Sequence, residues 1–276
     1  MTYLEISLPR LAISFALIVG AILLSRRSRV GLEGQLLWGA IRAAAQLLAI
    51  GYGLLLLFGH ERPWSVLLVL LVMVLVAAAT AARRVEHGPP SRRLFLPALL
   101  AIVGGGSLAL VPVFAFVISP TPWYEARLLV PISGMILSNA MNVVALVFER
   151  LFSVAESEAP RIEQLLSLGA TPAQALETQE RAAVRAAMIP AINGLLTVGL
   201  VALPGMMTGQ IVSGTPPIRA VRYQIVIMYQ LAAVATVSSL LAAWLVRRLV
   251  FNRHQQLATA RASARRASAP SEAPAR

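Results

Sequence analysis

The sequence predicts an all-α fold, a polytopic integral membrane protein of about seven transmembrane helices, with its N-terminus outside and its C-terminus in the cytoplasm. Of the 276 residues, 58% are hydrophobic and only 13% are charged, whereas soluble domains are about half apolar and about a quarter charged. The apolar residues form continuous runs of about 20 residues, the length that crosses the hydrocarbon core as a helix. Most arginines lie at the ends of these runs or in the C-terminal tail.

Seven apolar segments are long enough to span a bilayer. They cover residues 4–24, 36–58, 64–82, 94–118, 128–148, 190–212 and 221–246. The first is not interpreted as a cleaved signal peptide, because its leader is not basic and the arginines follow the apolar stretch. We expect residues 1–256 to form one transmembrane domain. Residues 257–276, rich in Ala, Ser, Arg and Pro, should form a disordered basic tail.

Arginine-rich connections alternate with arginine-poor ones. The rich segments follow the first, third, fifth and seventh spans and hold Arg26, Arg27, Arg29, Arg83, Arg84, Arg92, Arg93, Arg150, Arg161, Arg181, Arg185 and the seven arginines from Arg247 onward. The opposite segments hold Arg10, Arg62, Arg127 and Arg219. The positive-inside rule then sets the stated orientation. The net charge of +12 therefore reflects membrane topology, and we expect lipid rather than nucleic acid as a partner.

Three residue types are missing from the sequence: Cys, Lys and Asp. Their absence excludes disulfides, thiolate metal sites, a P-loop lysine, a Schiff-base lysine and an Asp-based catalytic set. We therefore expect this chain to bind no cofactor and to have no nucleotide-hydrolysing site of its own.

The long cytoplasmic segment 149–189 contains a helix–turn–helix pattern. A short amphipathic face at helical spacing comprises Ile162, Leu165, Leu166 and Leu168. Gly169 is the residue type that ends helices in a left-handed conformation. A new helix is expected from Thr171 as N-cap, with Pro172 at the first position and Gln174 closing a capping box.

Glu177 and Arg181, four residues apart in the favourable order, support that second helix toward Met188. Such an elbow, projecting from the cytoplasmic side of a bundle, can dock into a groove of another protein. The alternative is an ordinary connection folded against the base of the bundle.

Polar side chains inside the spans are the candidate functional groups, because they are costly in hydrocarbon. Arg42 lies about two turns into the second span with Gln46 on the same face, and Glu149 lies at a similar depth. Arg42 either pairs structurally and snorkels toward the headgroups or contacts a substrate or gate. Asn139 and Asn142 of the fifth span either line a path or join helices by hydrogen bonds.

The sixth span contains a proline–glycine interruption. Pro204 and Gly205 begin it, and Gly205 with Gly209 forms a GxxxG pair, surrounded by Met206, Met207, Thr208 and Gln210. Broken helices of this kind mark binding sites in transporters. The alternative is a packing seam with methionines as flexible filler. Because thioethers are soft ligands and the three His lie outside the spans, Met206 and Met207 offer at most a weak metal site.

Leu168-Gly169-Ala170-Thr171-Pro172 resembles the coupling loop of ABC-transporter permeases. The stretches Gly205-Met206-Met207-Thr208-Gly209-Gln210 and Ala220-Val221-Arg222-Tyr223-Gln224 resemble the FetB-like iron-export permease family, which is related to the plant aluminium-tolerance permeases. The resemblance covers about residues 35–256, including Arg42, Gln46 and the segment from Met135 to Met141. It departs from the general importer motif, since Gly169 lies six residues beyond Glu163 and Ile189-Pro190 is much further on.

This resemblance implies a permease subunit that exports iron or another metal across the bacterial inner membrane. ATP would be bound by a separate ABC-type ATPase subunit, and two permease copies would assemble. The residues expected to couple to the ATPase are Glu163, Gly169, Ala170, Thr171, Pro172 and Gln174. Those expected along the translocation path are Arg42, Gln46, Asn139, Asn142, Pro204, Gly205, Met206, Met207, Gly209 and Gln210.

Two alternative functions stay open at this point. One is an ABC permease for a sugar-nucleotide or a lipid-linked substrate, and the other is an ATP-independent secondary transporter or channel. The second lacks visible inverted repeats and mid-span acidic residues. A membrane enzyme is disfavoured, because no set of nucleophile, base and oxyanion stabiliser is found.

Overall fold

The computed structural model describes residues 8–29, 31–59, 62–252 and 254–257, which form helices and no strand. The chain divides into two compact units, Met1–Arg62 and Pro63–Arg276. Unit 1 holds α1 (Leu8–Arg27) and α2 (Glu33–Gly59), which contact each other. Unit 2 holds α3 (Pro63–Arg83), α4 (Ser91–Pro112), the π-helical turn η1 (Val113–Ile118), α5 (Ala126–Ser157), α6 (Ala159–Ser167), α7 (Pro172–Thr197), α8 (Gly205–Val212) and α9 (Pro217–Val250). Most of the predicted tail, residues 258–276, lies outside the described residues.

Five helical segments of the described chain are long and apolar enough to cross a membrane. They are α2, α3, the combined α4–η1 segment (Ser91–Ile118), α5 and α9. The all-α membrane fold is therefore as predicted, while the number of seven spans stays a prediction.

The expected sixth span, 190–212, has the predicted interruption at Pro204 and Gly205, but its N-terminal boundary is wrong. Its first residues belong to α7, which starts at Pro172 and continues through Pro190 to Thr197. A connection follows, in which Gly199 has a φ of +82°, and α8 begins only at Gly205. Hydropathy placed a boundary at Pro190, but an interior proline removes one backbone hydrogen bond without ending a helix that its neighbours hold.

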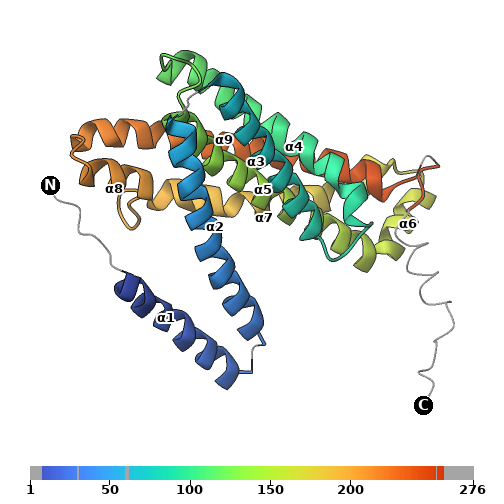
Figure 1. The fold of residues 1–276 in the computed structure, drawn as a ribbon. Coiled ribbons are helices and arrows are strands. Elements are labelled where there is room, and N and C mark those ends of the chain that lie inside the picture. The colour runs from blue at the N-terminus through green and yellow to red at the C-terminus, as the bar shows by residue number, and fades with distance from the viewer. Residues whose placement is uncertain (1–7, 30, 60–61, 253, 258–276) are drawn as a thin grey trace. The chain divides into compact units, whose positions relative to one another are not determined.

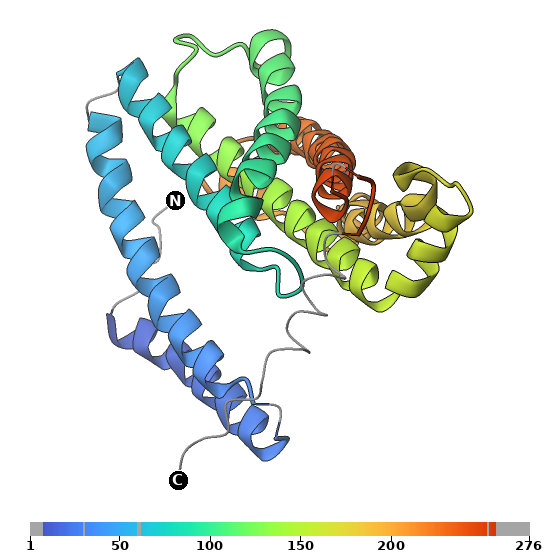
Figure 2. The same ribbon diagram turned by 90° about the vertical axis from the view of Figure 1, so that its right-hand side faces the viewer.

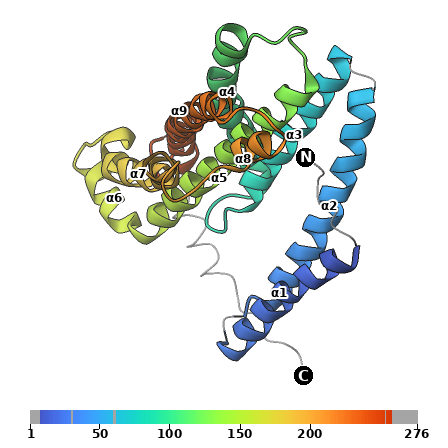
Figure 3. The ribbon, with the colours of Figure 1, turned by 90° about the vertical axis from the view of Figure 1, so that its left-hand side faces the viewer.

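The core of unit 2 is built around α5 and α9. Helix α9 contacts α4, α5, α7 and α8, and Figure 2 shows it nearly end-on with α4, α5 and α7 around it. Among the largest fully buried side chains are Ile132, Ile136, Phe148 and Phe152, all from α5. The α6 helix and the start of α7 form a projection at the edge of this bundle (Figure 3).

Helices α4 and α9 approach most closely at Gly105. A Cβ at this position would lie 2.0 Å from Oγ of Ser238 and 3.0 Å from its backbone nitrogen. Small residues at a helix interface allow this approach, and dispersion contacts and interhelical hydrogen bonds hold membrane helices together. The sequence motif Gly104-Gly105-Gly106 therefore marks a packing seam that sequence analysis did not identify.

Most of the described arginines of unit 2 belong to helical segments at one end of the bundle, the end that lies at the right of Figure 1. This end comprises Arg83, Arg84, Arg92, Arg93, Arg150, Arg161, Arg181, Arg185, Arg247 and Arg248. The opposite end holds Arg127, Arg219 and Arg222. We call the first group the basic end. The alternation of charge along the sequence thus becomes a separation in space.

Candidate functional site

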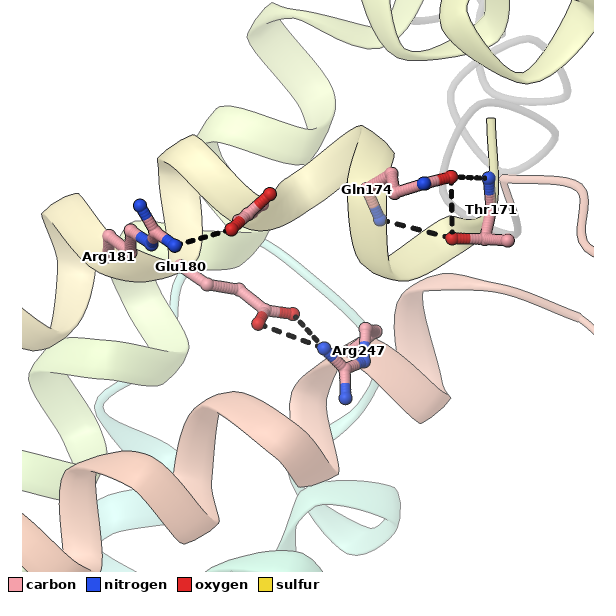
Figure 4. A network of polar contacts seen from close by, with 6 residues as sticks. Thr171, Gln174, Glu180, Arg181 and Arg247 are labelled. Atoms are coloured by element: carbon pink, nitrogen blue, oxygen red, sulfur yellow. Dashed lines mark hydrogen bonds and ion pairs between the residues drawn. The ribbon is translucent and has the colours of Figure 1, made fainter. Parts of the chain in front are cut away.

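The predicted elbow forms between α6 and α7. Gly169 adopts a φ of +90°, and the amide of Ala170 donates to the carbonyl of Leu165 at 3.0 Å, which closes the end of α6 as expected for a left-handed glycine cap. At the start of α7, the Thr171 amide donates to Gln174 Oε1 at 2.8 Å, and the Gln174 amide donates to Thr171 Oγ1 at 3.3 Å (Figure 4). The predicted capping box and its helix start are confirmed.

The hydrophobic face of α6 differs from the prediction in one residue. Ile162 is buried, and Leu165 and Leu166 are partly buried against the core, but Leu168 is 77% exposed. The cause is that Leu168 lies beyond the last helical residue, Ser167, so it leaves the helical face. Glu163 is also exposed. The tip of the elbow therefore presents an apolar side chain to its surroundings.

Two polar contacts tie the first turns of α7 to neighbouring elements, and a third lies within α7. Glu177 and Arg181 form the predicted ion pair, at 2.5 Å. Glu180 accepts from Arg247 of α9 at 3.1 Å (Figure 4). Burial raises the pKa of Glu180, while the charge of Arg247 opposes that rise. Gln179 donates to Glu158, at the start of α6, at 2.9 Å. A displacement of the elbow must therefore involve α7 and the end of α9 together.

A cavity of about 640 Å³ lies among α5, α7 and α9. Its lining from α5 includes Pro131, Met135, Ser138, Asn139 and Asn142; its other walls are formed by Pro190, Ala191 and Gly194 of α7 and by Met228 and Leu231 of α9. The lining contains no carboxylate. It offers thioether, amide and hydroxyl groups without a negative charge that would compensate a divalent cation.

Both predicted asparagines line this cavity, and each also has a partner. Asn139 Nδ2 donates to the carbonyl of Leu231 at 2.9 Å, so the alternative of helix joining holds for Asn139. Asn142 Oδ1 accepts from Arg84 Nη1 at 2.6 Å. This bond places a guanidinium at the edge of the cavity toward the basic end. Sequence analysis missed Arg84, Met228 and the α7 wall, because nothing in the local pattern indicates which helices face each other.

The α8 residues predicted for the path do not line this cavity. Pro204 is the N-cap of α8, Met207 is buried and Met206 is partly buried. Gly205 and Gly209 have open space where a Cβ would lie, so they form no packing seam within the described chain. Gln210 Oε1 is buried and has no hydrogen-bond partner among the described residues. The described residues include no cluster of three His or Glu side chains that could hold a metal ion.

Arg42 and Gln46 lie on exposed positions of α2 in unit 1. Glu149, the partner considered for Arg42, is bonded elsewhere: its Oε1 lies 2.5 Å from His87 Nδ1, and its Oε2 accepts from the Glu86 amide at 2.8 Å. Glu149 thereby fixes the α3–α4 connection onto α5. The hydrogen bond and charge of Glu149 raise the pKa of His87 above its usual value of 6.5.

Comparison with known proteins bears on the whole chain. The sequence profile of UPF0014, described as an uncharacterised protein family, matches residues 8–251. The chain belongs to the UPF0014 family. A UPF0014 membrane protein of Synechocystis is 39% identical over 87% of this chain and 92% of its own length.

Two further UPF0014 relatives have more specific names. The "Probable iron export permease protein FetB" of Escherichia coli is 36% identical over 90% of this chain and 94% of its own length. The "Protein ALUMINUM SENSITIVE 3" of Arabidopsis thaliana is 33% identical over 90% of this chain and 89% of its own. No solved structure gives a significant match. The resemblance noted in the sequence is therefore confirmed, and the chain is a multi-pass membrane protein.

Proposed function

We propose that this UPF0014 chain is the permease subunit of an ABC transporter in the bacterial inner membrane. One observation carries the proposal: α7 is a single helix that begins at the elbow and ends beyond the cavity. Its capping box at Thr171 and its cavity-lining residues Pro190, Ala191 and Gly194 belong to one continuous helix. A push on the elbow from outside therefore reaches the cavity wall.

In this proposal the basic end faces the cytoplasm, as the positive-inside rule requires. Helix α7 then enters the membrane from the basic end, and the segment from Met188 through α8 supplies the sixth span. With α1, α2, α3, α4, α5 and α9 it gives seven crossings, with the N-terminus outside and the C-terminus in the cytoplasm. Two copies of the chain and two ATPase subunits form the assembly.

The energy for transport comes from the partner, because this chain supplies no nucleotide-hydrolysing site. Closure of the ATPase subunits on ATP pushes the exposed tip around Leu168 and Gly169. Helix α7 transmits the movement, and Pro190, at the cavity wall, is its flex point. The contact of Glu180 with Arg247 makes α9 follow.

The cargo proposed is iron or another metal, and the name of the FetB relative supports it. The cavity lining lacks carboxylates and has Arg84 at its edge, so the metal would pass as a neutral or anionic chelate rather than as a hydrated cation. The same observation favours a second candidate, an ABC permease for an anionic organic molecule such as a sugar-nucleotide. Cellular iron content with and without the transporter pair separates the two.

The elbow can be tested with a pair of glycine variants. Gly169 and Gly214 both have left-handed φ values, +90° and +95°, and both have open space where a Cβ would lie. Valine at either costs about 1–2 kcal/mol in backbone strain, but only Gly169 lies at the elbow. We expect Gly169→Val to reduce co-purification of the ATPase and transport, and Gly214→Val to leave co-purification unchanged. Unchanged co-purification and transport in Gly169→Val would remove the proposed role.

A second variant tests docking without backbone strain. Leu168 is exposed and follows the last residue of α6, so Leu168→Glu should leave the fold intact while placing a charge at the proposed contact. We expect it to weaken ATPase binding at an unchanged thermal midpoint. Retention of the ATPase at the level of the unaltered protein would show that the elbow tip is not the contact.

A further inference from the structure

A second groove, outside the cavity already described, runs between α7 and α9 at the basic end. It has a volume of about 490 Å³, and its walls include Glu180, Arg185, Met188, Ile192, Leu240 and Trp244. Ile192, Leu240 and Trp244 are 44%, 56% and 41% exposed, respectively. The groove is thus open and largely apolar, and it lies on the surface of unit 2.

The groove changes from polar to apolar along its length, and both walls change at the same level. On α7, the charged residues Glu177, Glu180, Arg181 and Arg185 are followed by the apolar Met188 and Ile192. On α9, Arg247 and Arg248 follow Trp244, which follows Leu240. The two helices run in opposite directions here, so charged groups lie beside charged groups and apolar groups beside apolar ones. This is the pattern of a surface that crosses the boundary between headgroups and acyl chains.

Two arginines at the polar end of the groove keep their charge available. The two carboxylates of the groove are already paired, Glu177 with Arg181 and Glu180 with Arg247. Arg185 has no ion-pair partner in the part of the chain that the structure describes. The guanidinium of Arg248 lies 3.7 Å from the ring centroid of Trp244, a residue of the groove wall, and forms no ion pair with the described residues.

We propose that this groove is a specific binding site for an anionic phospholipid. The phosphate is held by Arg185 and Arg248 at the polar end, and an acyl chain lies along Met188, Ile192 and Leu240. Trp244 occupies the level of the headgroups, where indole rings are favoured. Basic pockets between transmembrane helices on the cytoplasmic side are suited to such headgroups.

The charges favour lipid over a second protein copy as the occupant. In a symmetric contact between two copies, this groove would face the same groove of the other copy, which would have to present an unpaired carboxylate to Arg185 and Arg248. The carboxylates of the groove are already engaged in ion pairs. A phospholipid offers a phosphate and an acyl chain in one molecule, at the spacing between polar and apolar parts that the groove requires. The site is independent of the cargo and of the ATPase.

The test is native mass spectrometry of the full chain in a neutral detergent, with phosphatidylglycerol or phosphatidylcholine added at equal concentration. We expect retention of phosphatidylglycerol at low lipid excess and not of phosphatidylcholine. An arginine beside an anionic lipid contributes about fivefold in affinity. The double variant Arg185→Gln/Arg248→Gln should therefore bind phosphatidylglycerol about thirtyfold more weakly.

The matched control is Arg93→Gln/Arg150→Gln, which removes the same charge from the same end but outside the groove. It should bind phosphatidylglycerol like the unaltered chain. Equal loss of bound phosphatidylglycerol in both double variants would show only a general attraction of the lipid to the basic end. Equal retention of the lipid in both would show that the groove is not its binding site. A change from dimer to monomer without a change in bound lipid would identify the groove as a contact between copies. Each of these three results overturns the proposal.

A measurement without arginine substitutions guards against a misfolded variant. Phosphatidylglycerol brominated on its acyl chains quenches nearby tryptophans, and the sequence has four. We expect quenching by brominated phosphatidylglycerol, relative to brominated phosphatidylcholine, to fall on Trp244→Phe. An unchanged difference between the two lipids in that variant would contradict the proposed position of the lipid.

Discussion

The seam between α4 and α9 allows a prediction of stability from geometry alone. Replacing Gly105 by alanine adds a Cβ 2.0 Å from Ser238 Oγ, 3.0 Å from its backbone nitrogen and 3.1 Å from its Cβ. Rotation of the serine side chain can relieve the first contact but not the other two, so the two helices must move apart. Overpacking of this kind costs about 1–3 kcal/mol.

The neighbouring glycines supply controls on the same helix. At Gly106 a Cβ would lie 3.4 Å from Leu137 Cδ2, an ordinary contact, and at Gly104 it would lie 2.7 Å from Leu241 Cδ1, the end of a flexible side chain. All three substitutions gain the same helix propensity, about 1 kcal/mol. The difference between Gly105→Ala and Gly106→Ala therefore isolates the clash with α9.

Thermal unfolding in detergent, followed by tryptophan fluorescence, measures that difference. At about 2–4 °C per kcal/mol for a chain of this size, Gly105→Ala should unfold roughly 2–12 °C below Gly106→Ala. Addition of Ser238→Gly should recover part of the loss, because it removes Oγ and Cβ and leaves only the backbone contact. Equal midpoints for Gly105→Ala and Gly106→Ala would refute the close approach of α4 and α9.

Three further predictions concern the elbow, the cavity and the α3–α4 connection. Thr171→Ala removes the capping box and should destabilise the start of α7 by about 1 kcal/mol, seen as faster hydrogen exchange at residues 173–176; unchanged exchange would contradict the cap. Arg84→Gln should alter transport while Arg93→Gln does not, and equal transport rates in both would separate Arg84 from the path. His87 has a raised pKa, so its ion pair with Glu149 is fully present below about pH 6.5 and is lost as the pH rises through the raised value. Hydrogen-exchange protection of the amides of residues 86 and 87, corrected for intrinsic rates, should therefore fall as the pH rises through the pKa of His87. In His87→Ala the protection should not depend on pH. Protection that rises with pH in the unaltered chain would rule out this pairing.

Local features of this fold could be predicted from the sequence because their causes lie within a few residues. Gly169 needs a left-handed conformation, and Thr171 with Gln174 can close a capping box in any context. The continuity of α7 was missed because its first half is polar and so has low hydropathy. The helix nevertheless continues through the whole segment. The helix of residues 172–197 therefore extends beyond the apolar stretch that hydropathy identifies as part of a membrane span.

The site depends on pairings between distant segments, which the sequence pattern does not contain. Asn139 and Asn142 line the cavity as the path prediction required, but their hydrogen-bond partners, Leu231 and Arg84, belong to distant segments of the chain. Met206 and Met207 were placed on the same path because of the proline–glycine interruption and the family resemblance, yet α8 lies outside the cavity lining. The GxxxG motif indicated Gly205 and Gly209 as a packing pair, but a Cβ at either would meet open space. The close helix contact lies instead at Gly105, beside Ser238.

The dependence of transport on a nucleotide-hydrolysing partner tests the account most directly. The chain is reconstituted in vesicles in three ways: alone, with the ABC-type ATPase proposed as its partner, and with that ATPase when the chain carries Gly169→Val. We predict cargo movement only in the presence of both the ATPase and ATP, at a rate reduced by Gly169→Val. Full-rate movement by the chain alone would contradict the proposal that force enters through the elbow.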